Sequence, residues 1–258
     1  MSIHETAIVD PGAELGAEVK VGPFCIIEDG VTLGDGCIIG PNCVIRRGVT
    51  MGVENTLDIG VVLGGAPQDV KYAGEESFVH IGDRNRLREY VTIHRATGEG
   101  AATQVGDDNF LMAYAHLGHN VRIGSNIMLA SYAGLSGHCT VEDRVIIGGL
   151  TGLHQYVTVG RMCMIGGHSR ITRDIPPFVT AQSNDLRSIN VIGLQRNGVS
   201  SEEQTALREA FRMIHRSKLN VSDAIARLRE DGPLSELVTE FVEFIERMDE
   251  GCRGRQQS

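Results

Sequence analysis

Residues 3–45 read IHETAI VDPGAE LGAEVK VGPFCI IEDGVT LGDGCI IGPNCV I, and they divide into blocks of six. Each block opens with an aliphatic residue, and in most blocks a small or β-branched residue stands four positions later. The same phase continues to Ile171. Counting in steps of six from Ile3 to Ile171 gives 29 positions, and 26 of them are Leu, Ile, Val or Met. A helix cannot keep one apolar face on a strict six-residue period, because its own repeat is about 3.6 residues.

The six-residue period predicts a parallel β-helix made of short strands separated by sharp turns. The small residue and the next aliphatic residue are two apart, so in an extended segment both point into one narrow interior. Glycine makes up 32 of the 258 residues, often follows the aliphatic position and tolerates tight corners. Five of the six cysteines occupy the small slot, which predicts packing rather than catalytic or metal-binding roles: Cys25, Cys37, Cys43, Cys139 and Cys163.

Composition and charge exclude several other classes of protein. Trp is absent and aromatic residues reach 5%, which excludes a core built on large rings. No apolar run approaches the ~20 residues of a membrane span, and the first residues lack the basic and apolar segments of a secretory signal. We therefore expect a cytoplasmic protein with no membrane segment. The net charge of −9 argues against a general nucleic-acid binder.

The repeat is interrupted twice and then ends. The pattern is lost near residues 64–80 and 95–104, where loops are expected. After Pro176 and Pro177 the sequence becomes helical, and Ser200-x-x-Glu203 has the form of a capping box. The predicted organisation is a β-helix over residues 1–180 and a C-terminal helical domain over residues 181–258.

Four histidines are expected at one corner of the coil if each turn contains three hexads. Positions that agree modulo 18 then lie on one edge of the prism, which groups His116, His119, His138 and His154. The same arithmetic places His94 beside Gly167 at a different corner. A homotrimer could bring two such corners together, so active sites between subunits are predicted.

A histidine near neutral pH is well suited to remove a proton from a hydroxyl group. Acyl transfer from a thioester needs such a base and a donor for the developing oxyanion. Gly137 precedes His138 at the same corner and can offer its backbone N–H. This chemistry requires no metal and no cofactor.

The pattern [LIV]-G-x-x-[small]-x resembles that of the left-handed parallel β-helix acyltransferases. More specifically, the chain resembles the family of UDP-N-acetylglucosamine O-acyltransferases that begin lipid A synthesis. The strings that carry this resemblance are QDVKYAGE (68–75), IGDRNRLREYVTIHR (81–95), AHLGHN (115–120), IIGGLTGLHQ (146–155) and DIPPF (174–178). The resemblance implies a left-handed coil with three hexads per turn, a homotrimer, a UDP-sugar acceptor, and a donor thioester on the phosphopantetheine of acyl carrier protein.

The resemblance also assigns roles by position. His119 corresponds to the general base, Gly137 to the oxyanion donor, and Gly167 to the position that limits acyl length. With glycine there, a long 3-hydroxyacyl group is expected to fit. The other implied substrate contacts are Asp69, Lys71, His94, His116, His138, His154, Gln155, Asn190 and Arg196.

Two segments depart from the family pattern. Many members have Asp after the base, whereas Asn120 stands here, and a neutral amide orients an imidazole without stabilising its protonated form as a carboxylate does. Residues 193–198 read GLQRNG and lack two basic residues of the pattern. Residues 161–218 nevertheless carry nine basic and five acidic side chains, which suits an acidic carrier protein.

Several further functions stay compatible with the sequence alone. A γ-carbonic-anhydrase-like zinc hydratase shares the repeat but needs three histidines that converge on zinc. A related N-acyltransferase carries a distinct N-terminal domain, whereas the hexads here start at Ile3, and the intact histidine cluster argues against a non-enzymatic scaffold. An acyltransferase that uses a 3-amino sugar nucleotide would share most contacts and stays open. Metal analysis and transfer assays with both sugar nucleotides distinguish among them.

Overall fold

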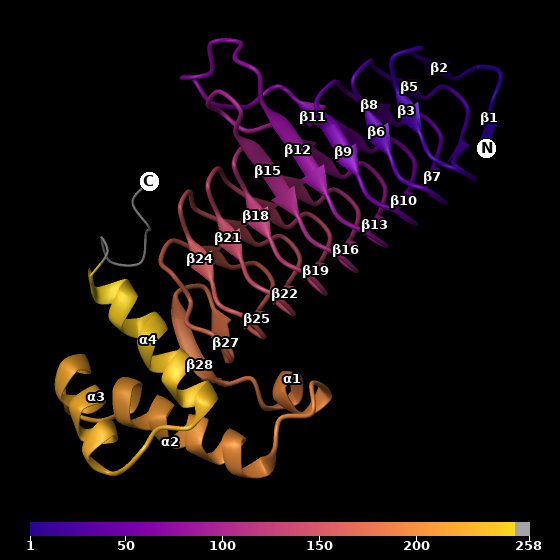
Figure 1. The fold of residues 1–258 in the computed structure, drawn as a ribbon. Helices are drawn as coiled ribbons and strands as arrows, with labels where there is room; N and C mark the ends of the chain where they lie inside the picture. Colours follow the sequence, from indigo (N-terminus) through magenta and orange to yellow (C-terminus); the bar gives the residue numbers. More distant parts are fainter. Residues whose placement is uncertain (251–258) are drawn as a thin grey trace.

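The computed structural model describes residues 1–250 and consists of a three-sided coil with helices at its C-terminal end (Figure 1). Strand β1 (Ser2–Ile3) pairs in parallel with β4 (Lys20–Val21), so that Ser2 lies beside Lys20. The partner strand is therefore three hexads further along the chain. Three hexads make one turn, as the resemblance implied.

Each side of the prism is a sheet of short strands. The first sheet has 11 strands: β1, β4, β7 (Ile38–Ile39), β10 (Thr56–Leu57), β13 (Arg86–Leu87), β16 (Phe110–Leu111), β19 (Met128–Leu129), β22 (Ile146–Ile147), β25 (Met164–Ile165), β27 (Val179–Gln182) and β28 (Asp185–Ile189). The second has nine: β2 (Ile8–Val9), β5 (Ile26–Ile27), β8 (Val44–Ile45), β11 (Val62–Gly65), β14 (Thr92–His94), β17 (His116–Leu117), β20 (Gly134–Leu135), β23 (Gly152–Leu153) and β26 (Arg170–Ile171). The third has eight: β3 (Glu14–Leu15), β6 (Thr32–Leu33), β9 (Val49–Met51), β12 (Phe78–Ile81), β15 (Ala102–Val105), β18 (Arg122–Ile123), β21 (Thr140–Val141) and β24 (Thr158–Val159).

The interior of the coil is filled as the repeat predicted. The aliphatic positions from Val21 to Ile171 are buried, and the five cysteines of the small slot are fully buried. Their thiols also bond to backbone carbonyls of the next turn, as from Cys37 Sγ to Gly52 O at 3.1 Å and from Cys139 Sγ to His154 O at 3.0 Å. Burial raises the pKa of Cys139 to about 12. These cysteines are therefore packing residues, while Cys252 lies outside the described residues.

Two loops lengthen the step between turns without changing the six-residue phase. Val44 pairs with Val62, but Val62 pairs with Thr92, and Thr92 pairs with His116. The steps are thus three, five and four hexads. Because each loop adds whole hexads, the aliphatic positions stay in phase on both sides of it.

The C-terminal part begins with an antiparallel hairpin. Strands β27 and β28 pair across the expected boundary between residues 180 and 181, and the helices follow. These are α1 (Val191–Arg196), α2 (Ser201–Arg216), α3 (Val221–Glu230) and α4 (Glu236–Glu250). The apolar faces of α2 and α4 pack together, with Phe211 and Phe241 buried. Among these described helices, none has both the length and the apolar character needed to cross a bilayer.

The capping box at the start of α2 is only half formed. The hydroxyl of Ser200 accepts from the Glu203 N–H at 3.2 Å. The Glu203 carboxylate instead accepts from Ser235 Oγ at 2.7 Å and from the Leu237 N–H at 2.9 Å. It therefore satisfies a free N–H group at the start of α4, and so ties one helix to another.

Candidate functional site

The predicted histidine cluster lies where the nine-stranded sheet turns into the eight-stranded sheet. We call this edge the histidine corner and define it by His119, Gly137, His138, His154 and Gln155. The His138 N–H donates to His119 O at 3.0 Å, so the two residues lie in neighbouring turns. Their rings meet nearly at right angles, with centroids 5.1 Å apart. The ring of His154 lies on the same edge, with Nδ1 at 3.3 Å from Gln155 O.

The prediction that His94 lies at a different corner is wrong. His94 ends β14, which pairs directly with β17, and its ring centroid lies 5.2 Å from that of His116. The modular arithmetic failed because the turn between these strands contains four hexads and not three. His94 therefore belongs to the edge of the histidine corner, where its Nδ1 lies 2.7 Å from Ala66 O.

His116 is a neutral residue at physiological pH. Burial, with a smaller contribution from His94, lowers the pKa of His116 to about 4. Its Nδ1 lies 2.8 Å from the hydroxyl of Thr92 in the neighbouring strand, which fixes the ring. His116 is therefore suited to orient a substrate by hydrogen bonding and poorly suited to hold a proton at pH 7.

His119 is only 4% exposed and lies directly over Gly137. A Cβ atom at position 137 would come within 2.3 Å of His119 Nε2, so only glycine leaves the ring in this place. The other ring nitrogen, Nδ1, lies 2.9 Å from Asn120 Oδ1. Nε2 is thus the nitrogen that faces the Gly137 backbone.

The loop after β11 brings two further expected residues to this corner. Asp69 Oδ1 accepts from the Lys71 N–H at 3.0 Å, which lowers the pKa of Asp69, and the charge of His119 lowers it further. Burial, followed by the charge of His119, lowers the pKa of His138, on which Asp69 and Lys71 act in opposite directions. The four side chains therefore share one electrostatic environment.

A hollow of about 520 Å³ adjoins the corner on the eight-stranded sheet. His138 and Tyr156 line it, together with His80, Gln104 and Arg122 of the outward face. The last three were not predicted from the sequence. They lie in register across β12, β15 and β18, but the step from His80 to Gln104 is again four hexads. An assumed spacing of three hexads per turn therefore does not predict that His80, Gln104 and Arg122 lie side by side.

Three expected residues lie away from the histidine corner within a single chain. Gly167 is at the corner between the 11-stranded and nine-stranded sheets, where a Cβ would come within 3.1 Å of Gly149 O. Asn190 caps α1 and donates from Nδ2 to Met162 O at 2.8 Å. Arg196 ends α1 and is exposed.

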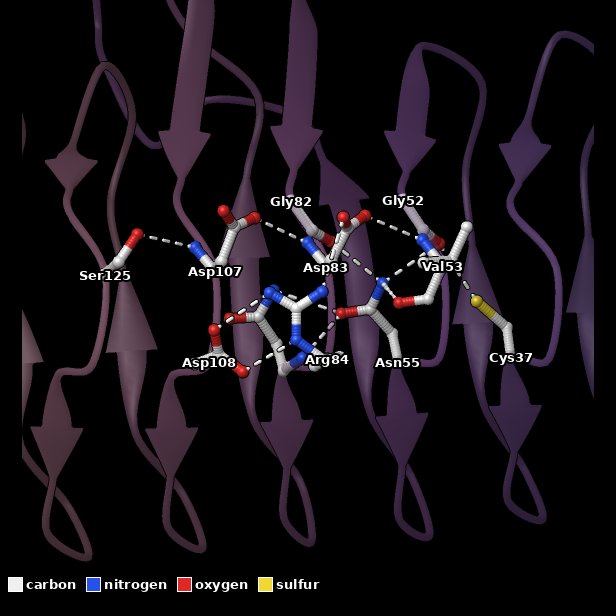
Figure 2. A network of polar contacts seen from close by, with 11 residues as sticks. Cys37, Gly52, Val53, Asn55, Gly82, Asp83, Arg84, Asp107, Asp108 and Ser125 are labelled. Carbon is white, nitrogen blue, oxygen red and sulfur yellow. Dashed lines mark hydrogen bonds and ion pairs between the residues drawn. The ribbon is translucent and has the colours of Figure 1, made fainter.

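The third edge, which we call the ladder corner, uses the same turn in a different way (Figure 2). There the side chain of one turn accepts from a backbone N–H of the turn before it. The pairs are Ala17 to Asp35 at 2.7 Å, Val53 to Asp83 at 2.9 Å, Asp83 to Asp107 at 2.7 Å, Asp107 to Ser125 at 2.9 Å and Ser125 to Asp143 at 2.8 Å. Gly137 occupies the same position of its hexad, but its N–H has no acceptor among residues 1–250. The histidine corner therefore leaves a free donor beside His119.

Within the part of the chain that the structure describes, no group of three or more His, Cys, Asp or Glu side chains is arranged to hold a metal ion. The histidines of the corner bond instead to hydroxyl, amide and carbonyl oxygens, as Thr92, Asn120 and Ala66 show. This arrangement suits hydrogen bonding and proton transfer.

A triangular coil of hexapeptide repeats with histidines at one corner is the architecture expected of a hexapeptide-repeat transferase. The model of the bacterial transferase hexapeptide family matches residues 12–47 and 102–137, and that of domain 2 of UDP-N-acetylglucosamine O-acyltransferase matches residues 174–254. An acyl-[acyl-carrier-protein]–UDP-N-acetylglucosamine O-acyltransferase from Chlorobaculum tepidum is 60% identical over 95% of this chain and 94% of its own length. The enzyme of that name from Thermodesulfovibrio yellowstonii is 41% identical over 97% and 99%.

Solved structures give the same result. A UDP-N-acetylglucosamine acyltransferase from Bacteroides fragilis matches with a TM-score of 0.92 at 36% identity, over 99% of this chain and 100% of that one. The enzyme from Campylobacter jejuni matches at 0.88 and 34%, over 95% and 96%. The chain belongs to the UDP-N-acetylglucosamine O-acyltransferase family, and its fold is a left-handed parallel β-helix with a C-terminal helical domain.

Proposed function

We propose that the histidine corner transfers a 3-hydroxyacyl group from acyl carrier protein to the 3-hydroxyl of UDP-N-acetylglucosamine, the first step of lipid A biosynthesis. The observation that carries this proposal is the placement of His119 Nε2 over Gly137, whose N–H has no acceptor in the described chain. A base and an oxyanion donor thus stand side by side. The relatives, which carry the name of this O-acyltransferase, agree with the acyltransferase rather than with a zinc hydratase.

The reaction follows from this pair of groups. His119 Nε2 removes the proton of the sugar 3-hydroxyl as that oxygen attacks the thioester carbonyl. The carbonyl oxygen becomes negative and accepts from the Gly137 N–H. When the C–S bond breaks, the imidazolium returns the proton to the leaving sulfur, which releases the carrier thiol and the ester. The acyl group arrives on the phosphopantetheine of the carrier protein, so no other cofactor takes part.

Asp69 and Lys71 are proposed to hold the sugar nucleotide, because their loop brings a carboxylate and an ammonium group whose charges both act on His138. The neutral His116 and the ring of His94 are suited to orient the sugar hydroxyls. His138, His154 and Gln155 complete the contacts on the same edge. Each role is one of binding and orientation, which contributes to rate by fixing the reacting atoms in place.

A homotrimer accounts for the residues that lie elsewhere in the chain. Gly167 lies on another edge and Asn190 and Arg196 lie at the ends of α1, so we propose that another copy supplies them to a histidine corner. The edge next to Gly167 carries a column of Tyr90, Tyr114, Tyr132 and Leu150, which are 45–55% exposed. The tyrosine rings stack at 5.1 and 4.8 Å. An ordered apolar column of this kind suits contact with a second chain.

The C-terminal part is the proposed landing site of the acidic carrier protein. A hollow on α2 is lined by Arg212, Met213 and Arg216, with Glu209 and Ser217 beside them. Arginines around an apolar residue suit an acidic helical partner, and binding is expected to weaken steeply with salt. The proposed compartment is the cytoplasm, because the five described cysteines are buried and unpaired.

The test is a transfer assay with a panel of acyl carrier thioesters against UDP-N-acetylglucosamine and its 3-amino analogue. His119→Ala should reduce kcat by at least about 10³-fold, because both proton transfers lose their base. Cys37→Ser, an equally buried substitution in the N-terminal part of the coil whose Sγ bonds to Gly52 O, is the matched control and should retain transfer. Full activity of His119→Ala would overturn the proposed base, and preference for the amino sugar would overturn the acceptor.

A further inference from the structure

The side chain of Asn120 is held by a single residue of the loop that follows β14. The Thr97 N–H donates to Asn120 Oδ1 at 2.9 Å, and Asn120 Nδ2 donates to Thr97 O at 3.0 Å. The Asn120 N–H in turn donates to Thr103 Oγ1 at 3.0 Å. Backbone and side chain of this residue are therefore both fixed by the segment that precedes β17.

These contacts determine which amide atom is the oxygen. A backbone N–H can only donate and a carbonyl can only accept. The reversed amide would place NH₂ against the Thr97 N–H and oxygen against the Thr97 carbonyl, which are two unfavourable contacts. The oxygen must therefore face the Thr97 N–H, and it is this oxygen that lies 2.9 Å from His119 Nδ1.

The identity of that oxygen determines the tautomer of His119. An amide oxygen only accepts, so Nδ1 at hydrogen-bond distance must carry the proton. In the neutral ring, the lone pair is then on Nε2, the nitrogen that lies over Gly137. The ring is thus ready to accept a proton at the side where the oxyanion donor stands.

We propose that Asn120 is a positioning residue that locks His119 in the Nδ1–H tautomer and that the Thr97 backbone sets its orientation. The inference rests on the proposed function, in which His119 is the base. On its other side the loop is held by Glu75, which accepts from the Gly98 N–H at 2.9 Å. The loop that lengthens this turn to four hexads therefore supports the base.

A carboxylate at position 120 would act differently. It can accept from His119 and from the Thr97 N–H, but it has no hydrogen to donate to Thr97 O. Aspartate would add a negative charge beside the imidazole and would lose half of the contact with the loop. Asparagine here gives up charge stabilisation of the imidazolium in exchange for a firmly held ring.

The first experiment measures the tautomer directly by ¹⁵N NMR of the histidine-labelled full-length protein, with His119→Gln to assign the signal. We expect the Nδ1–H form in the unmodified protein and a mixture with Nε2–H in Asn120→Gly. Asn126→Gly is the matched control, because Asn126 has φ 59° against 58° for Asn120, and its side chain has no hydrogen-bond partner in the described chain. An Nε2–H signal in the unmodified protein, or the same mixture in the control, overturns the proposal.

The second experiment measures kcat and KM against pH. Asn120→Gly should lower kcat roughly 10- to 100-fold with little change in KM for the nucleotide, because the ring is misplaced and binding groups are kept. Asn120→Asp should recover part of kcat and move the acid limb about one unit to higher pH. Unchanged kcat and an unchanged profile in both variants would overturn the proposal. Activity of His119→Ala would instead overturn the proposed function, while the NMR result would still stand.

Discussion

The histidine corner and the ladder corner use the same turn of the same repeat for opposite purposes. At the ladder corner, the Asp83 carboxylate accepts from the Val53 N–H, and the Asp107 carboxylate accepts from the Asp83 N–H. These backbone donors are therefore satisfied within the fold. At the histidine corner, Gln155 stands where a capping Asp or Ser would be, and the Gly137 N–H has no acceptor in residues 1–250. The difference shows that the coil supplies a regular set of backbone donors. Side chains then decide which of them serve stability and which remain for chemistry.

Among substitutions that probe the difference between the two corners, the largest effect is expected when the ladder arrangement is copied into the histidine corner. Gln155→Asp should place a carboxylate against the Gly137 N–H, as Asp107 does for Asp83. The oxyanion then loses its donor and meets a negative charge, so kcat should fall by about 10²- to 10³-fold. Gln155→Ala is the control, because it removes the same glutamine without supplying a cap. Equal losses of kcat in the two variants would show that the free N–H is not the oxyanion donor.

A smaller effect, on stability alone, is expected from a substitution behind the ladder corner. Asn85 is fully buried; its N–H donates to Asn55 Oδ1 at 2.8 Å, and its Oδ1 accepts from the Asn109 N–H at 2.9 Å. Asn85→Ala removes the side chain and leaves the buried Asn109 N–H without this acceptor, which should cost about 2–3 kcal/mol of unfolding free energy. Thermal unfolding measures the loss, and transfer activity at 25 °C should be unchanged. Asp83→Ala, at a half-buried position, should cost about 1 kcal/mol of unfolding free energy, and a larger loss there than for Asn85→Ala would contradict the prediction.

The smallest of the three main effects concerns pH and comes from His116 in β17, beside the histidine corner. Burial lowers the pKa of His116 to about 4, so the unfolded chain takes up this proton first as the pH falls. The stability contributed by the neutral ring is therefore present above pH 6.5 and is lost as the pH falls from about 6.5 to 4. Since part of the ring faces solvent, we expect a loss of about 1–2 kcal/mol. Chemical denaturation at pH 7 and pH 4.5 should show it in the unmodified protein relative to His116→Gln, and parallel curves would contradict it.

The fold could be predicted from the sequence because its cause is local. An aliphatic residue every six positions from Ile3 to Ile171 determines the narrow interior, and the five buried cysteines follow from the same rule. The grouping of His119 and His138 also followed, because both lie where the step is a regular three hexads. The site was predicted less completely. His80 was missed and His94 was assigned to the wrong corner, because the turns that begin at these residues contain four hexads.

The helical part shows the same limit. Ser200 and Glu203 have the spacing of a capping box, and Ser200 caps α2 as that pattern predicts. The Glu203 carboxylate, however, bonds to Ser235 and Leu237 at the start of α4, far along the sequence. Local spacing identifies the residues that can cap a helix, and the packing of α2 against α4 decides which helix receives the bond.

The sequence by itself thus determined the repeat and the packing role of the cysteines, and its resemblance to a known family implied the three-sided coil on which the predicted histidine edge depends. Only the tertiary structure decided the length of each turn, the placement of His94, the free N–H of Gly137 and the hold of Thr97 on Asn120. The physical reason is that an insertion of whole hexads leaves a six-residue period intact. The six-residue period can therefore be read from the sequence along the whole coil. The number of hexads in each turn cannot, because it depends on pairing between strands that are distant in the sequence.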